Sequence, residues 1–113
     1  MVDAVVVLTT VPTGEAGEAI AQALVEERLA ACVNVLAPMT SVYRWRGAIE
    51  RETEHQVVIK TTVDRVPALR TRLAALHPYE LPEFIVLRMA DGGEEYLKWI
   101  GRESSDPELK IKN

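Results

Sequence analysis

Residues 4–12 read Ala-Val-Val-Val-Leu-Thr-Thr-Val-Pro, and this stretch predicts the first strand of the fold. β-branched residues favour a strand, and Pro12 ends the strand because proline has no backbone N–H for the ladder. A strand with one covered face normally alternates apolar and polar residues. Residues 4–8 are all apolar and do not alternate with polar residues, so the stretch predicts a strand with apolar side chains on both faces.

The segment after this strand has the pattern of a helix. Thr13 is a candidate N-cap, and Glu15 and Glu18 place negative charge where the helix dipole favours it. Apolar residues then recur at helical spacing from Ala16 onward. We expect this helix to run to about Leu29 or Ala30.

Two strands joined by a tight turn come next. The first covers residues 32–36, is interrupted at Ala37-Pro38, and resumes over residues 40–46. A proline inside a strand indicates an edge strand with a bulge. Gly47 provides the turn, and residues 48–61 return antiparallel to the first strand. The sequence therefore predicts a long hairpin.

A second helix and a fourth strand complete the pattern. Asp64 is a candidate N-cap, Pro67 fits the first helical turn, and His77-Pro78 ends the helix. Residues 84–89 form an apolar strand, and Asp91-Gly92-Gly93 leads into a short helix that carries Tyr96, Leu97 and Ile100. A polar tail covers about residues 102–113.

The order βαββαβ plus a terminal helix is that of one α+β domain over residues 1–113, of ferredoxin-like type. Its antiparallel sheet has helices on one face, with strands one and three in the centre. Strands one, three and four all carry apolar residues on both faces, so one chain leaves an apolar sheet face uncovered. We expect self-association through this face and through the edge of the second strand.

Composition excludes several classes of protein. The net charge is −4 with interleaved signs, so we expect no nucleic-acid partner. The first residues lack the pattern of a secretory signal or a membrane span, so we expect a cytoplasmic protein without a membrane partner. A single cysteine, Cys32, forms neither an intrachain disulfide nor a CxxC motif. The glycines match no phosphate-binding loop, so no organic cofactor is expected.

Two kinds of chemistry can be read from individual residues. The candidate metal ligands are Cys32, His55, His77, Glu50, Glu52 and Glu54. Their spacing matches no specific metal-binding motif. The three glutamates alternate with period two, which is typical of a solvated strand face. Cys32 with His77 as base would be a covalent-catalysis pair. A small core residue explains Cys32 better, so we expect no enzyme.

The least ordinary stretch is residues 77–83, His-Pro-Tyr-Glu-Leu-Pro-Glu, between a helix and a strand. It is either a rigid loop that displays a binding site or a stiff connector. Tyr43 and Trp45 share one strand face, which is typical of interface anchors or core. Lys60 interrupts an apolar strand, so it reaches water at the sheet rim or pairs with a carboxylate such as Glu83.

Six ordered motifs closely resemble the CutA divalent-cation tolerance family over roughly residues 4–100. They are residues 5–12 (Val-Val-Val-Leu-Thr-Thr-Val-Pro), 27–34 (Glu-Arg-Leu-Ala-Ala-Cys-Val-Asn), 40–47 (Thr-Ser-Val-Tyr-Arg-Trp-Arg-Gly), 59–62 (Ile-Lys-Thr-Thr), 77–83 and 96–100 (Tyr-Leu-Lys-Trp-Ile). The resemblance implies a ferredoxin-like fold assembled as a tight homotrimer, with sheets around a threefold axis and interlocked hairpins. It also implies tolerance of copper and other divalent ions, and an architecture like that of PII signalling proteins, which bind small ligands between subunits.

On this resemblance we expect an intersubunit cleft, with His77 as a neutral nitrogen ligand, Glu83 and the hairpin carboxylates as oxygen ligands and Lys60 as a charge partner. The other residues expected at this cleft are Cys32, Asn34, Tyr43, Trp45, Glu52 and Tyr79. The copper site attributed to the family uses a cysteine at the end of strand one and a histidine pair before the Pro-Tyr motif. Thr9 and Leu76 stand at two of these positions, and only His77 matches.

Three functions follow from these observations, in order of preference. The first is a trimeric protein of the response to divalent metal ions that binds copper or another divalent cation. The second is a PII-like sensor that binds a metabolite or an anion in the same clefts. The third is an enzyme that depends on Cys32.

Overall fold

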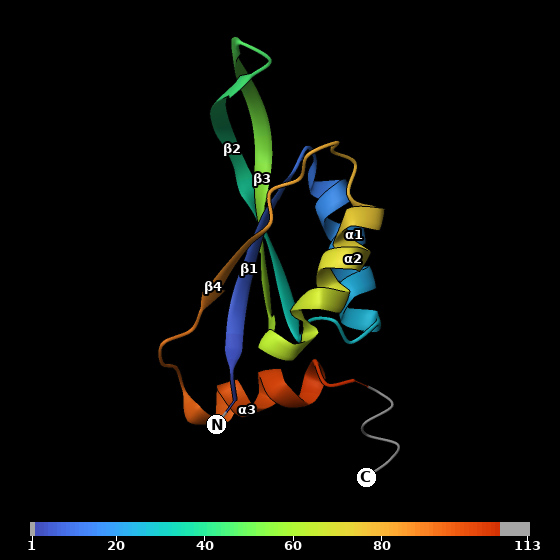
Figure 1. Ribbon diagram of the computed structural model, residues 1–113, viewed down its shortest axis with the longest axis vertical. Helices are drawn as coiled ribbons and strands as arrows, with labels where there is room; N and C mark the ends of the chain where they lie inside the picture. The colour runs from blue at the N-terminus through green and yellow to red at the C-terminus, as the bar shows by residue number, and fades with distance from the viewer. Residues whose placement is uncertain (1, 107–113) are drawn as a thin grey trace.

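The computed structural model describes residues 2–106 and shows the predicted βαββαβ order with an additional C-terminal helix (Figure 1). The elements are β1 (Ala4–Val11), α1 (Gly14–Glu26), β2 (Cys32–Trp45), β3 (Ala48–Thr62), a 3₁₀ turn (Val63–Arg65), α2 (Val66–Leu76), β4 (Ile85–Arg88) and α3 (Glu94–Glu103). The strands form one antiparallel sheet in the order β2-β3-β1-β4. Strands one and three are therefore central, as predicted.

The main core lies between the sheet and the helix pair α1 and α2, which lie side by side on one face (Figure 1). Val5 and Val7 of β1 pair with Thr61 and Ile59 of β3, and all four side chains are fully buried. Facing residues of the helices, such as Leu24, Leu69 and Leu73, fill the other side of this core. The covered face is thus built as the sequence predicts.

Helix α1 begins at the predicted cap but ends earlier than predicted. The backbone N–H of Ala16 donates to Thr13 Oγ1 at 3.1 Å. The expected end at Leu29 or Ala30 is wrong, because the helix ends at Glu26 and Arg28 adopts a left-handed φ of 59°. The N–H groups of Arg28 and Leu29 donate to the carbonyls of Val25 and Leu24, which is the Schellman end of a helix.

The hairpin of β2 and β3 has the predicted shape. The register shifts between Val35 and Pro38, which confirms the bulge on an edge strand. Arg46 and Gly47 form a two-residue turn with φ of 48° and 82°, the left-handed values that such tight hairpins need. The distal half of the hairpin projects as an arm beyond the helices (Figure 1). The radius of gyration is accordingly 15.1 Å, against about 13 Å for a compact domain of this length.

The start of the second helix differs from the prediction. Asp64 lies in the 3₁₀ turn and accepts a hydrogen bond from Thr62 Oγ1 at 2.6 Å, so it is not the N-cap of α2. The helix begins at Val66, with Pro67 in its first turn as predicted. A proline there costs no hydrogen bond, because the first N–H groups of a helix have no partner inside it.

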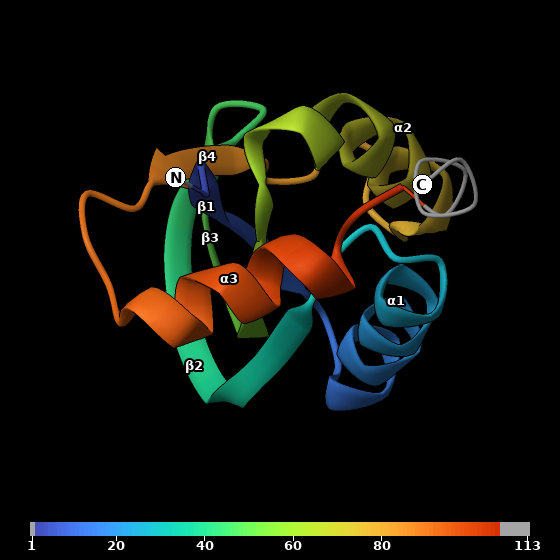
Figure 2. The ribbon, with the colours of Figure 1, turned by 90° about the horizontal axis from the view of Figure 1, so that it is seen from below.

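Helix α3 lies across one end of the sheet (Figure 2). Ile100 is fully buried and packs with Ala4 and Ala31 in a second, smaller core. The face of the sheet opposite α1 and α2 carries polar residues such as Lys60 and Gln56 and a cluster of apolar residues, which we call the open face: Val6, Leu8, Val58, Ile85 and Leu87. Ile85 and Leu87 are 44% and 48% exposed. Within residues 2–106, α3 packs over one end of this face, and the loop of residues 77–83 contacts Glu54 and Gln56 near the other end. The apolar residues between them stay partly exposed, which agrees with the prediction that one chain leaves an apolar sheet face uncovered.

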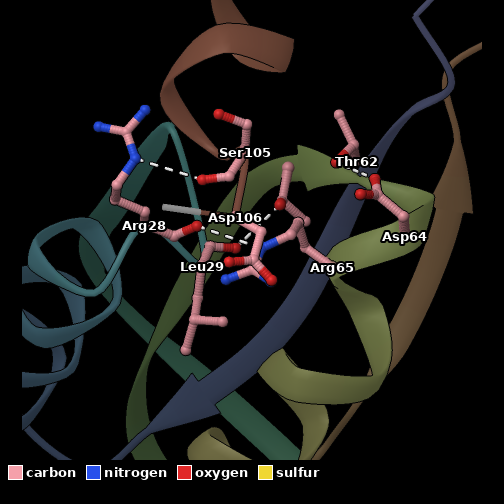
Figure 3. A network of polar contacts seen from close by, with 8 residues as sticks. Arg28, Leu29, Thr62, Asp64, Arg65, Ser105 and Asp106 are labelled. Carbon is pink, nitrogen blue, oxygen red and sulfur yellow. Dashed lines mark hydrogen bonds and ion pairs between the residues drawn. The ribbon is translucent and has the colours of Figure 1, made fainter. Parts of the chain in front are cut away.

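The chain after α3 is fixed by Arg28 (Figure 3). The guanidinium of Arg28 donates to the carbonyls of Arg102 and Ser105, at 2.6 and 3.2 Å. Arg65 donates to the Arg28 carbonyl and forms an ion pair with Asp106. The predicted polar tail thus includes the last turn of α3 and a buried residue, Ser104. Residues 107–113 lie outside the described residues.

Candidate functional site

A cleft lies between the arm of the hairpin and the loop that follows α2. Its volume is about 570 Å³, and it is lined by Thr10, Tyr43, Trp45, Glu54 and residues 78–83. This volume is within the range of pockets that hold small molecules. The unusual loop read from the sequence therefore forms one wall of a cleft.

His77 fixes this loop to the sheet. The backbone N–H of Tyr79 donates to His77 Nδ1 at 3.1 Å, so Nδ1 is the unprotonated nitrogen. His77 Nε2 then carries the proton and donates to the Thr10 carbonyl at 2.8 Å. Burial lowers the pKa of the imidazole below its ordinary value, although the bond to Thr10 and the charge of Glu54 act in the opposite direction. His77 is therefore a neutral side chain that joins the loop to the sheet: Nδ1 accepts from the loop, and Nε2 donates to β1.

Tyr79 and Glu54 form a second link between the loop and the hairpin. The Tyr79 hydroxyl donates to Glu54 Oε2 at 2.6 Å. Burial and this hydrogen bond raise the pKa of the Tyr79 phenol, and burial together with nearby glutamates raises the pKa of Tyr43. Both phenols stay protonated at neutral pH and can donate hydrogen bonds. Glu54, at 8% exposure, is not part of a solvated strand face, so the prediction from the period-two glutamates is wrong for this residue.

Four of the residues predicted at the cleft are brought together within one protomer: Tyr43, Trp45, Tyr79 and Glu83. The sequence argument gave no signal for Thr10, and it named Glu54 only as one of three alternating glutamates. Glu52 lies on the same strand but does not line the cleft. The adjacent loop of two prolines was the feature that pointed to this region.

Cys32, Asn34 and Lys60 lie together near the other end of the sheet. Cys32 pairs with Lys60 in the register of β2 and β3, and its thiol is 3.9 Å from Asn34 Oδ1. Lys60 Nζ donates to the Tyr96 hydroxyl at 3.3 Å, so it does not pair with Glu83. Glu83 instead accepts a hydrogen bond from Gln56 Nε2 at 2.9 Å.

Cys32 and His77 are not a catalytic pair within one protomer. His77 binds the carbonyl of Thr10, which pairs with Gln56, whereas Cys32 pairs with Lys60. Four residues along a strand separate these positions by about 13 Å. A nucleophile and its base need hydrogen-bond distance.

Residues 2–106 of one protomer do not form a metal site. Among residues 2–106, no three His, Cys, Asp or Glu side chains gather into a group that could hold a metal ion. Thr9, at the position of the cysteine attributed to the family's copper site, has a buried hydroxyl without a hydrogen-bond partner in this part of the chain. His77 has no free nitrogen lone pair. The assignment of His77 and Glu83 as metal ligands stays a prediction.

The fold and the cleft define a class of protein: a ferredoxin-like α+β domain with a projecting hairpin, an added C-terminal helix and an apolar open face. The family model of the CutA1 divalent ion tolerance protein matches residues 5–103. The chain belongs to this family.

Relatives of known name and structure agree with this assignment. The divalent-cation tolerance protein CutA of Thermus thermophilus is 50% identical over 95 residues, which cover 84% of this chain and 92% of that protein. The chloroplastic protein CutA of Arabidopsis thaliana is 39% identical, over 88% of this chain and 54% of that protein. The crystal structure of CutA from Xylella fastidiosa superimposes with a TM-score of 0.89 at 47% identity, over 91% of this chain and 99% of that one. Within residues 2–106, no helix is both long and apolar enough to cross a membrane.

The titration of His77 gives a first prediction. Its pKa in the folded protein is below the unfolded value of about 6.5, so the unfolded chain takes up the proton first as the pH falls. Stability that is present above pH 6.5 is therefore lost as the pH drops toward the folded pKa. We expect the urea concentration at the midpoint of unfolding, measured in the presence of EDTA, to be lower at about pH 5.5 than at about pH 7.5.

The matched variants assign this change to one histidine. His77→Gln should be less stable at neutral pH but should show a smaller change in midpoint between the two pH values. His55→Gln removes the other histidine and should keep the wild-type change. An equal change in wild type and His77→Gln would show that the buried imidazole is not the titrating group.

Proposed function

We propose that this protein acts in the tolerance of divalent cations as a homotrimer in the cytoplasm, without being an enzyme. Membership of the CutA1 family supports the role in cation tolerance. The observation that carries the assembly is the open face, where Ile85 and Leu87 are almost half exposed beside other apolar residues. Exposed apolar surface of this kind marks an interface. The number of subunits is what the family resemblance implies.

The arm of the hairpin supports the same proposal. Beyond the bulge it carries Val42 and Ile49, which are 55% and 62% exposed. Two-stranded ribbons are at best marginally stable alone in water, so the arm needs contacts that one protomer does not give along most of its length. A neighbouring copy of the chain provides such contacts if the hairpins interlock.

The cleft also favours the second function, a sensor that binds a small ligand. Its volume suits a small molecule, and the loop that forms one wall is held by His77 and Tyr79. An anion suits it poorly, because three carboxylates line it, those of Glu54, Glu80 and Glu83. We therefore propose ligand binding at the cleft with a ligand other than an anion.

Metal binding by His77 can be tested directly. Because both of its nitrogens are engaged with the backbone, we expect isothermal titration with Cu²⁺ or Zn²⁺ to give the same weak binding for wild type and His77→Gln. His55→Gln is the matched control, since it removes the more exposed histidine. Tight binding that is lost in His77→Gln and kept in His55→Gln would show that the predicted ligand is correct and that the loop rearranges to bind the metal.

A further inference from the structure

Glu54 is a buried carboxylate without a counter-charge. It is 8% exposed, and its hydrogen-bond partner is the neutral hydroxyl of Tyr79. Among residues 2–106, no Lys, Arg or His side chain lies within ion-pair distance of Glu54. Removing a carboxylate from water is costly unless a positive charge or several hydrogen bonds compensate. Within residues 2–106, the Tyr79 hydroxyl is therefore the side-chain group that compensates the Glu54 carboxylate.

The rest of the cleft also favours positive charge. The rings of Tyr43, Trp45 and Tyr79 line it, and the faces of aromatic rings attract cations. Two further carboxylates, those of Glu80 and Glu83, lie along the loop wall. Rings beside carboxylates complement a cation that carries an apolar body.

The guanidinium of Arg46 already interacts with a ring and a carboxylate at the mouth of the cleft. Arg46 lies 5.4 Å from the centre of the Trp45 ring and forms an ion pair of 3.3 Å with Glu80. Both charged groups are largely exposed. Arg46 therefore interacts with the outer ring and the outer carboxylate. Glu54, Tyr43 and Tyr79 line the cleft beside this pair.

A metal ion does not meet these requirements. Ions such as Cu²⁺ and Zn²⁺ need several nitrogen, sulfur or oxygen ligands at about 2 Å, and the described residues gather no such group. A cleft of about 570 Å³ walled by rings is also much larger than an ion. The occupant that fits is organic.

We propose that the cleft binds a small organic cation, an ammonium or guanidinium compound with an apolar body. The charged head lies at Glu54, and the body packs against the rings of Tyr43 and Tyr79. The proposal names the chemical class of the ligand for this same cleft, and it rests on the ligand binding proposed above. If the protein were a monomer that binds such a cation, the trimer would be wrong and this site would stand.

Isothermal titration with three benzyl compounds tests the proposal. Benzyltrimethylammonium, benzyl alcohol and benzoate share a ring and differ in charge. We expect the cation to bind at least about tenfold more tightly than the neutral and the anionic compound, because only the cation gains from both the rings and the carboxylate. Glu54→Gln should lose about tenfold or more of this affinity while it keeps an acceptor for the Tyr79 hydroxyl.

Matched variants separate the site from general charge effects. Glu18→Gln removes the same charge from an exposed position of α1 and should leave the affinity unchanged. Tyr43→Leu keeps an apolar side chain in the cleft but removes one of the two rings against which the body packs, so it should weaken binding of the cation more than binding of the alcohol. This variant tests the proposal even if Glu54→Gln does not fold.

Two results would overturn the proposal. Equal affinities for the three compounds would mean that the cleft binds apolar rings alone. No binding of the cation by wild type would mean that Glu54 has another partner in solution, such as an arginine from a neighbouring copy of the chain.

Discussion

A Leu87→Glu variant will be a folded monomer where the wild-type protein is an oligomer. Leu87 is 48% exposed on the open face of one protomer, so a glutamate there reaches water and changes the stability of the isolated fold by about 0.5 kcal/mol or less. In an assembly that covers this face, the same carboxylate is buried without a partner, which costs about 3 kcal/mol or more per site. Sedimentation velocity gives the mass, and far-UV circular dichroism shows that the fold is kept.

Val86→Glu is the control for this experiment. Val86 is the preceding residue of β4, has a similar exposure of 37%, and lies on the opposite side of the strand. Its substitution should leave the oligomer intact. If both variants kept the wild-type mass, the open face would not be the interface.

A Gly17→Ala variant will be less stable by up to about 2 kcal/mol, even though alanine is the better helix former. A Cβ at position 17 would lie 2.9 Å from Val35 Cγ1 and 3.2 Å from Val11 Cγ2, because α1 packs closely on β1 and β2 there. The valines have stiff side chains, and overpacking of this kind costs about 1 to 3 kcal/mol. The gain in helix propensity is about 1 kcal/mol. Urea unfolding measures the difference.

Two further variants separate the clash from helix propensity. A Cβ at Gly14 would meet His55 only at 3.7 Å, which is ordinary contact, so Gly14→Ala should not destabilise. Combining Gly17→Ala with Val35→Ala should cost less than the sum of the two single changes, because the second removes the clashing methyl groups. A stabilised Gly17→Ala protein would contradict the close packing of α1.

The fold could be predicted from the sequence because its determinants are local. The β-branched runs, the Thr13 cap, Pro38 and Gly47 each act on their own segment, and together they give the order of elements. The misplaced end of α1 has a physical reason. Arg28 takes the left-handed conformation that usually selects glycine, and it is held there by contacts with residues more than 70 positions later. No local signal reports such contacts.

The candidate site could be predicted only in part, for a similar reason. The two prolines of the loop pointed to the region where the cleft lies, and the cleft is lined by Tyr43, Trp45, Tyr79 and Glu83 among others. Nothing in the alternation of the three hairpin glutamates distinguishes Glu54, which becomes buried only because the loop folds over it. The role of His77 as a loop anchor likewise depends on the Thr10 carbonyl, 67 residues away.

The account rests on the open face, which only further copies of the same chain are proposed to bury. Sedimentation equilibrium of the wild-type protein at micromolar concentration tests this most directly. We expect a single species with three times the 12.6 kDa mass of one chain. A stable species with the mass of one chain would contradict the account.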